Sequence, residues 1–180
     1  MTAVTALTVQ NTHGVKDIMD VPPHYVVAQM MAVLSDLGAD VVKTGMLART
    51  EVIEAVAPLV DDFPNPAVID PVMVASSGDR LLTEQAVSAI QSLMLPQAAL
   101  VTPNMPEAEI LTNRSVETLD DMKHAADRLM TDGAQAALIK GGHGNEAVVT
   151  DLLADQSGFT VFENPRFDSK NTHGTGCTLA

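Results

Sequence analysis

Short runs of β-branched apolar residues alternate along the chain with longer stretches in which apolar residues recur every three or four positions. The first pattern is typical of buried strands and the second of amphipathic helices. The strands predicted in this way cover residues 2–9, 41–44, 67–69, 98–101 and 136–139, followed by a hairpin of 147–154 and 158–163. The predicted helices cover residues 23–37, 50–63, 83–95, 106–111 and 118–131. This alternation indicates an α/β fold with a mostly parallel sheet covered on both faces, and without a linker we expect one domain, 1–180.

Composition and charge exclude several functions for a protein with this fold. Hydrophobic residues make up 46% of the chain, as in a globular protein. The formal charge is −13 and no basic run occurs, which argues against nucleic-acid binding through phosphates. The one cysteine, Cys177, excludes an internal disulfide and suits a reducing compartment. With no signal peptide or membrane span in the sequence, we expect a cytoplasmic protein without a membrane partner.

Polar and glycine residues gather just after the predicted strands. In parallel α/β sheets, ligands bind at the carboxyl ends of the strands. The segments at those points are Gln10-Asn11-Thr12, Gly45-Met46, Asp70-Pro71-Val72-Met73, Thr102-Pro103-Asn104 and Lys140-Gly141-Gly142-His143. The sequence therefore predicts a ligand site along this edge of the sheet.

Residues Gly174-Thr175-Gly176-Cys177 have the composition of an anion-binding loop. The two glycines allow a ligand to approach the backbone closely, and a helix beginning at Cys177 would direct several N–H groups at one point. A plain glycine turn before a helix would have the same sequence. Cys177 itself has two interpretations, a small buried apolar residue or a thiol whose pKa is lowered at a helix N-terminus so that it can accept a proton.

Three further segments contain residues suited to phosphate chemistry. Asn104 and Glu107 would lie at the start of a short helix, where they could orient water around Mg²⁺, although Glu there also compensates the helix dipole. Lys140 precedes two glycines at a strand end, which favours phosphate contact over an ordinary surface lysine. Asp70 ends a strand, as turn-forming aspartates do, and lies where a metal-linked carboxylate would.

Other known site types are not indicated. No histidine spacing matches a zinc site, and no nucleophile elbow of a serine hydrolase occurs. The sequence has no Walker A motif and no protein-kinase signature, so ATP chemistry would need another scaffold.

Five motifs occur together in an order known from one family. They are Lys43-Thr44-Gly45-Met46-Leu47, Asp70-Pro71-Val72-Met73, Thr102-Pro103-Asn104-Met105-Pro106-Glu107-Ala108, Lys140-Gly141-Gly142-His143 and Asn171-Thr172-His173-Gly174-Thr175-Gly176-Cys177. In this order they resemble the hydroxymethylpyrimidine and phosphomethylpyrimidine kinases of thiamine biosynthesis, which belong to the ribokinase-like superfamily. The resemblance extends over the whole chain and implies a three-layer α/β/α fold.

The resemblance also implies an activity and roles for single residues. The family uses ATP to phosphorylate 4-amino-5-hydroxymethyl-2-methylpyrimidine and then its monophosphate. By position, Gln10 and Met46 would bind the pyrimidine, and Asn104, Glu107 and Asp70 would serve the Mg²⁺–phosphate region. Lys140 and Thr172 would contact nucleotide phosphates. Gly174, Thr175 and Gly176 would form the anion hole with Cys177 as the base, a thiol that favours the pyrimidine branch or the similar pyridoxal kinases over sugar kinases.

The resemblance implies more structure than the chain contains. Family members begin with a strand and a glycine-rich segment that would precede Met1, and continue through helices that would follow Ala180. We therefore expect this chain to be poorly stable or inactive as a kinase, and an unpaired sheet edge would favour association as a homodimer. Two alternatives stay open: a pyridoxal kinase of similar sequence, and a ligand-binding fragment without catalysis.

Overall fold

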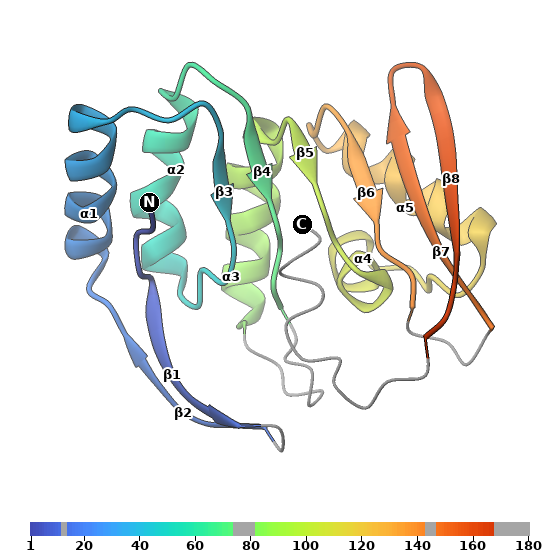
Figure 1. The fold of residues 1–180 in the computed structure, drawn as a ribbon, viewed down its shortest axis with the longest axis horizontal. Coiled ribbons are helices and arrows are strands. Elements are labelled where there is room, and N and C mark those ends of the chain that lie inside the picture. Colours follow the sequence, from blue (N-terminus) through green and yellow to red (C-terminus); the bar gives the residue numbers. More distant parts are fainter. Residues whose placement is uncertain (12–13, 74–81, 143–146, 168–180) are drawn as a thin grey trace.

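The described residues form one six-stranded sheet and one separate hairpin (Figure 1). The structure is a computed structural model, and it describes residues 1–11, 14–73, 82–142 and 147–167. The sheet contains, in spatial order, β3 (Val42–Thr44), β4 (Ala67–Ile69), β5 (Leu100–Val101), β6 (Ala137–Ile139), β7 (Val148–Asp155) and β8 (Gly158–Pro165).

The sheet is mostly parallel, as the sequence predicts. Strands β3 to β6 pair in parallel, whereas β7 and β8 run antiparallel and form the predicted hairpin at the edge. Strands β4 and β6 have alternating exposure because successive side chains point to opposite faces. On one face Ile69, Val101, Ile139 and Leu152 are at most 1% exposed, so this face forms the core.

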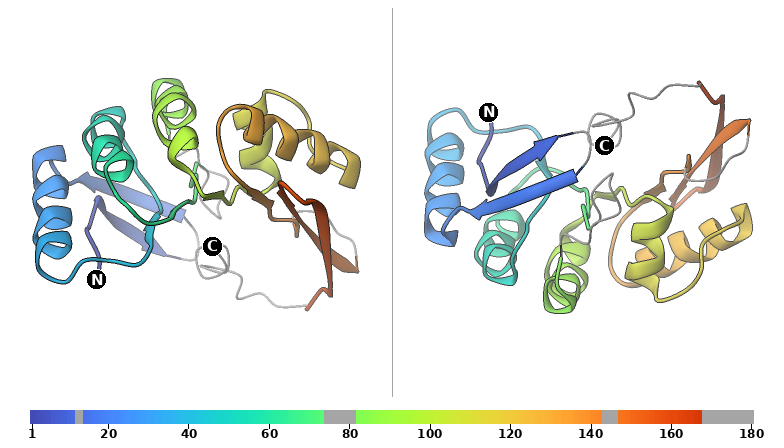
Figure 2. Two further views of the ribbon diagram at one scale, coloured as in Figure 1. Left: turned by 90° about the horizontal axis from the view of Figure 1, so that it is seen from above. Right: turned by 90° about the horizontal axis from the view of Figure 1, so that it is seen from below.

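The helices of the described chain lie on one side of this sheet (Figure 2). They are α1 (Pro23–Asp36), α2 (Thr50–Asp61), α3 (Glu84–Ala89), α4 (Met105–Thr112) and α5 (Leu119–Thr131). The expected second helical layer is not formed by the described residues. The α/β class is confirmed. No helix among the described residues has the length and apolar character needed to cross a membrane.

Local signals fix several helix ends. The Thr118 hydroxyl accepts the N–H of Asp121, whose carboxylate accepts the N–H of Thr118 in return, so α5 begins at a capping box. The predicted helix 83–95 is confirmed, but its second half is not a regular α-helix. There α3 continues as a π-helical turn, Ile90–Met94, and a 3₁₀ turn, Leu95–Gln97, which contains a proline.

The strand predicted at residues 2–9 does not join the main sheet. Residues Ala6–Asn11 form β1, which pairs antiparallel with β2 (Gly14–Asp20), a strand that the sequence analysis misses. Figures 1 and 2 show this hairpin projecting from the end of the sheet near α1. Its apolar side chains remain outside the core: Leu7 is 50%, Val9 58% and Met19 60% exposed. The hairpin therefore extends beyond the main core.

Candidate active site

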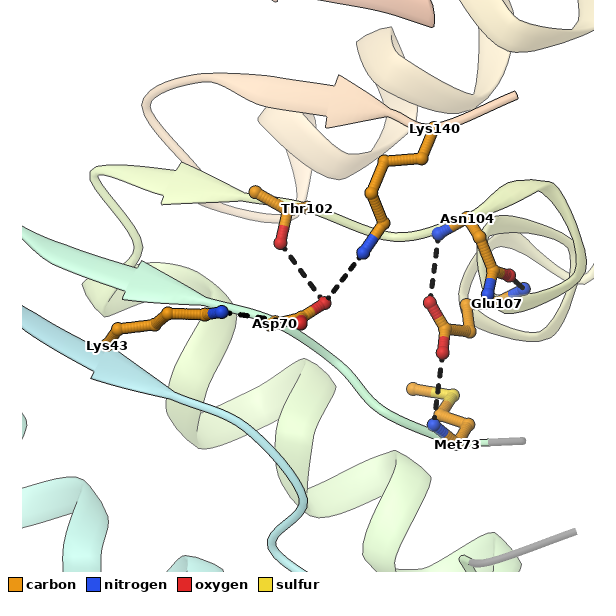
Figure 3. A network of polar contacts seen from close by, with 7 residues as sticks. All are labelled: Lys43, Asp70, Met73, Thr102, Asn104, Glu107 and Lys140. Carbon is orange, nitrogen blue, oxygen red and sulfur yellow. Dashed lines mark hydrogen bonds and ion pairs between the residues drawn. The ribbon is translucent and has the colours of Figure 1, made fainter. Parts of the chain in front are cut away.

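Three neighbouring strands bring Asp70, Thr102 and Lys140 together at their carboxyl ends (Figure 3). Each residue directly follows its strand or lies in the bridge that prolongs it. The Thr102 N–H donates to the Ile69 carbonyl at 3.0 Å, and Lys140 forms an isolated parallel bridge with Asn104. Backbone pairing thus continues past the strands and fixes the side chains that follow them.

Asp70 is the centre of this cluster and is only 2% exposed. Its Oδ1 accepts a hydrogen bond from Lys140 Nζ at 3.0 Å and another from Thr102 Oγ1 at 3.2 Å. Lys43 Nζ lies 3.9 Å from the other oxygen, Oδ2. A buried carboxylate needs such partners because the loss of water is costly for a charge. The structure therefore surrounds Asp70 with two cations and a hydroxyl.

Glu107 closes the other side of the cluster through a capping box at the start of α4. The Glu107 N–H donates to Asn104 Oδ1 at 2.9 Å, and the Asn104 N–H donates to Glu107 Oε2 at 2.9 Å. The Met73 N–H donates to Oε1 at 3.3 Å, so both carboxylate oxygens have backbone donors. Burial raises the pKa of Glu107, and the Asn104 N–H and the charge of Lys140 oppose that rise.

The glycine after Lys140 has a packing role. A Cβ on Gly141 would lie 2.9 Å from the carbonyl carbon of Thr150 and closer still to its oxygen, so any side chain would collide with β7. The Gly141 N–H donates to Asp151 Oδ1 at 2.7 Å. Gly142 has a φ of +83°, which favours glycine. The two glycines therefore fix the backbone beside Lys140, independently of the contacts that the Lys140 side chain makes.

The predicted pyrimidine residues lie on other elements. Gln10 is on the exposed strand β1, where its Oε1 accepts a 3.5 Å hydrogen bond from the Thr8 hydroxyl. Met46 follows β3, and its carbonyl accepts a hydrogen bond from the Thr5 hydroxyl at 2.7 Å. Met46 and Lys43 both line a groove of about 650 Å³ between residues 1–6, α1 and β3.

Part of the predicted site lies outside the described residues: Thr172, Gly174, Thr175, Gly176 and Cys177. Their roles stay predictions. Of the predicted site residues that are described, the structure brings together Asp70, Asn104, Glu107 and Lys140.

The sequence analysis gave no role to Lys43 and Thr102, which both contact Asp70. Each belongs to one of the sequence motifs, without a role of its own. Their positions could have identified them. Thr102 follows β5 beside Asp70, and Lys43 on β3 is in register with Val68, whose face Asp70 shares two residues later.

The carboxylates of Asp70 and Glu107 fit Mg²⁺ that also binds substrate phosphates and water better than they fit a metal ion bound only by protein side chains. Within the part of the chain that the structure describes, no group of three or more His, Cys, Asp or Glu residues could hold a metal ion. Mg²⁺ commonly uses one or two carboxylates together with substrate phosphates and keeps several waters. Asp70 directly follows β4 and Glu107 lies in the first turn of helix α4, and both supply such oxygen donors.

Comparisons with known proteins place the chain in a family. The phosphomethylpyrimidine kinase family model matches residues 1–180. The hydroxymethylpyrimidine/phosphomethylpyrimidine kinase of Bacillus subtilis is 44% identical over all of this chain and 67% of its own length. The Thiamine biosynthesis bifunctional protein ThiED of Geobacter sulfurreducens is 48% identical over 98% of this chain and 36% of its own.

A solved structure of a related kinase has the same fold as this chain. The pyridoxal kinase of Bacillus subtilis, determined as an ADP complex, superposes with a TM-score of 0.89 and 31% identity, over 99% of this chain and 69% of that one. The chain spans about two thirds of the length of the B. subtilis pyrimidine kinase and about a third of the bifunctional protein. The chain belongs to the phosphomethylpyrimidine kinase family.

Proposed function

We propose that the protein transfers the γ-phosphoryl group of ATP to 4-amino-5-hydroxymethyl-2-methylpyrimidine and then to the resulting monophosphate, in thiamine biosynthesis. In the first step, the bond between the γ-phosphorus and the bridging oxygen of ATP breaks and a bond to the hydroxymethyl oxygen forms. ADP leaves and the hydroxyl proton passes to a base. In the second step, an oxygen of the monophosphate takes the place of the alcohol.

One observation carries this proposal beyond the family match. Asp70, Lys140, Asn104 and Glu107 converge at the carboxyl ends of adjacent strands, where an α/β sheet binds its ligand. Phosphoryl transfer depends mainly on positioning and charge neutralisation. A chain of net charge −13 cannot attract phosphates with its surface as a whole, so cations held locally must do it.

The described residues supply different parts of this chemistry. Lys140 would contact nucleotide phosphates as a point charge, because its ammonium is held at the strand end by Asp70. Asn104 and Glu107 would orient water on the nucleotide side, and Glu107 and Asp70 would hold Mg²⁺ through water. When bound, Mg²⁺ would neutralise charge on the phosphates that take part in the transfer.

The remaining parts rest on the sequence. Gly174, Thr175 and Gly176 would donate backbone N–H groups to the transferred phosphoryl group, and Thr172 would contact the nucleotide. Cys177 would accept the hydroxyl proton, since a thiol at a helix N-terminus has a lowered pKa. Gln10 and Met46 would bind the pyrimidine. We place the protein in the cytoplasm, as a homodimer.

A pyridoxal kinase is the second candidate, because the pyridoxal kinase of Bacillus subtilis has the same fold at a TM-score of 0.89. Its identity of 31% is lower than the 44% of the B. subtilis pyrimidine kinase, which favours the pyrimidine. The two substrates share an aromatic nitrogen ring with a hydroxymethyl group, so only a direct comparison separates them.

The test measures products from ATP with the pyrimidine alcohol and with pyridoxal, by chromatography and mass spectrometry. We expect the pyrimidine monophosphate followed by the diphosphate, and a loss of about 10²- to 10⁴-fold in kcat for Cys177→Ala. A higher kcat/KM with pyridoxal would replace the substrate that we propose. Binding of the pyrimidine without turnover, unchanged in Cys177→Ala, would instead favour a non-catalytic ligand-binding protein.

A further inference from the structure

We infer that Thr5 is a positioning residue for the acceptor, because its hydroxyl joins the two segments that we propose to bind the pyrimidine. This inference rests on the proposed function and deepens it. Thr5 acts through Gln10 and Met46, which lie on different elements: Gln10 on β1 and Met46 in the turn after β3.

The turn that contains Met46 is held more by one hydrogen bond than by packing. Leu47 after it is buried, but Gly45 before it is exposed, and a Cβ on Gly45 would meet no described atom within 4 Å. The Thr5 hydroxyl donates to the Met46 carbonyl at 2.7 Å. Among the described residues, this hydroxyl is the one hydrogen-bond partner of the Met46 backbone. The bond therefore determines where the turn lies.

Thr5 also lies where the β1–β2 hairpin joins the rest of the fold. It directly precedes β1, and its carbonyl accepts the Val21 N–H at 3.1 Å, just after β2 ends. The Gln29 side chain of α1 binds both the N–H and the carbonyl of the preceding residue, Val4, at 3.0 Å each. Hydrogen bonds to two other segments thus fix the point from which the hairpin extends.

One more contact joins the base of this hairpin to the connection between β3 and α2. Arg49 Nε donates to Asp20 Oδ2 at 2.7 Å, so the last residue of β2 is bound to the segment that follows Met46. These two side chains are 60% and 29% exposed, and water and salt screen such a pair. The hydrogen bond of Thr5 is between uncharged groups, so it is the link that does not weaken with salt.

The length of the hairpin makes the position of Gln10 sensitive to this link. Gln10 lies five residues beyond Thr5 on the same strand. Five residues of a strand span about 16.5 Å, so a tilt of about 5° at Thr5 would move Gln10 by roughly 1.4 Å. Among the described strands, β1 pairs with β2 alone, so the main sheet does not correct such a tilt. A misplacement of about 1 Å in a binding site can cost up to about 100-fold in rate.

The Thr5 hydroxyl therefore sets the separation of Gln10 and Met46. Binding of an acceptor ring between these two residues depends on that separation. The nucleotide, which we propose to bind at Lys140 and Asn104, lies at other strand ends and does not depend on it. The role of Thr5 thus predicts a loss of affinity for the acceptor without a loss for ATP.

The experiment compares Thr5→Val, which removes the hydroxyl and keeps the shape of the side chain, with Thr5→Ser, which keeps the hydroxyl. The matched control is Thr131→Val on the distant helix α5, because the Thr131 hydroxyl also donates to a backbone carbonyl, that of Asp127, at 2.8 Å. Calorimetry without ATP measures the Kd of the pyrimidine alcohol and of its monophosphate, and turnover gives the KM for ATP. Circular dichroism and thermal unfolding verify that every variant is folded.

We expect Thr5→Val to weaken binding of both acceptors by the same factor, roughly 5- to 20-fold, because the change affects the ring that they share. The KM for ATP should not change. Thr5→Ser and Thr131→Val should both bind the acceptors as the wild type does.

A double-variant cycle separates positioning from a general loss of structure. If Thr5 acts by placing Gln10 relative to Met46, Thr5→Val should weaken acceptor binding much less in a Gln10→Ala background, because the placement of a missing side chain no longer matters. Additive losses, an equal loss for ATP, or no loss would overturn the inference and leave the kinase proposal intact.

The same measurements with pyridoxal keep the inference and the proposed function separable. A wild type that binds pyridoxal and not the pyrimidine would overturn the proposed substrate, and the cycle measured with pyridoxal would then decide the role of Thr5. A wild type that binds neither compound would overturn both proposals.

Discussion

The ion pair between Asp70 and Lys140 should couple the stability of the fold to the candidate site. The pair joins β4 to β6 across β5, at 3.0 Å, with side chains 2% and 9% exposed. Lys140→Met removes the ammonium and keeps much of the volume of the side chain. Asp70→Asn removes the charge of the partner and keeps its shape.

The size of the effect follows from the partners that remain. At 3.0 Å the Coulomb attraction is roughly 5 kcal/mol for an effective dielectric constant of about 20, and desolvation offsets much of it. Breaking a buried pair costs about 3–5 kcal/mol because an uncompensated charge remains. In Lys140→Met, Asp70 still has Thr102 and Lys43, so we expect the lower end, about 3 kcal/mol. The double variant removes both charges of the pair and should lose at least about 2 kcal/mol less than the two single losses combined.

The assay is equilibrium unfolding in urea of the wild type, both single variants and the double variant. The control cycle uses Arg128 and Asp132 on the surface, which pair at 2.8 Å with side chains 59% and 24% exposed. Water and salt screen that pair, so its coupling should be far smaller. A coupling between Asp70 and Lys140 no larger than that of the surface pair would refute the view that the cluster is a buried electrostatic unit.

Two further predictions concern its neighbours. Gly141→Ala should lower the free energy of unfolding by about 1–3 kcal/mol or more, because its Cβ would meet the Thr150 carbonyl. Gly45→Ala, whose Cβ meets no described atom within 4 Å, should change it little, and equal urea midpoints would contradict the packing role. Because burial raises the pKa of Glu107 above 4.5, the folded protein keeps that proton to higher pH than the unfolded chain does. The stability of the wild type relative to Glu107→Gln should therefore be greatest below pH 4.5 and fall as the pH rises through the folded-state pKa; a difference that is constant with pH would contradict this assignment.

The sequence predicted the site best where buried strands end. Ala67–Ile69 and Ala137–Ile139 are short apolar runs followed by one charged residue, and their sheet positions follow from general rules on parallel sheets. Asp70 and Lys140 could thus be placed at one edge without coordinates. Their direct contact could not, because two residues 70 positions apart meet only through the order of the strands.

The hairpin at the start of the chain could not be predicted in the same way. In β2, residues Gly14–Asp20, charged and apolar positions mix, and most of its side chains are exposed or half-buried. A strand that does not bury a face has no strong period in its sequence. The strand expected at residues 2–9 therefore gives no sign in its sequence that its partner is the next segment of the chain.

The position of Lys140 shows how packing and chemistry meet in this fold. Its N–H donates to the Pro103 carbonyl at 2.8 Å, and its carbonyl accepts the Met105 N–H at 3.2 Å. The next residue, Gly141, is held by Asp151 and has no room for a side chain. Hydrogen bonds and packing therefore fix the backbone on both sides of Lys140. Only the end of its side chain, the ammonium, can move in response to nearby charges. A substitution at Gly141 should consequently shift Lys140 as well. Gly141 serves only the packing of the sheet, yet it also determines where the Lys140 ammonium meets the Asp70 carboxylate.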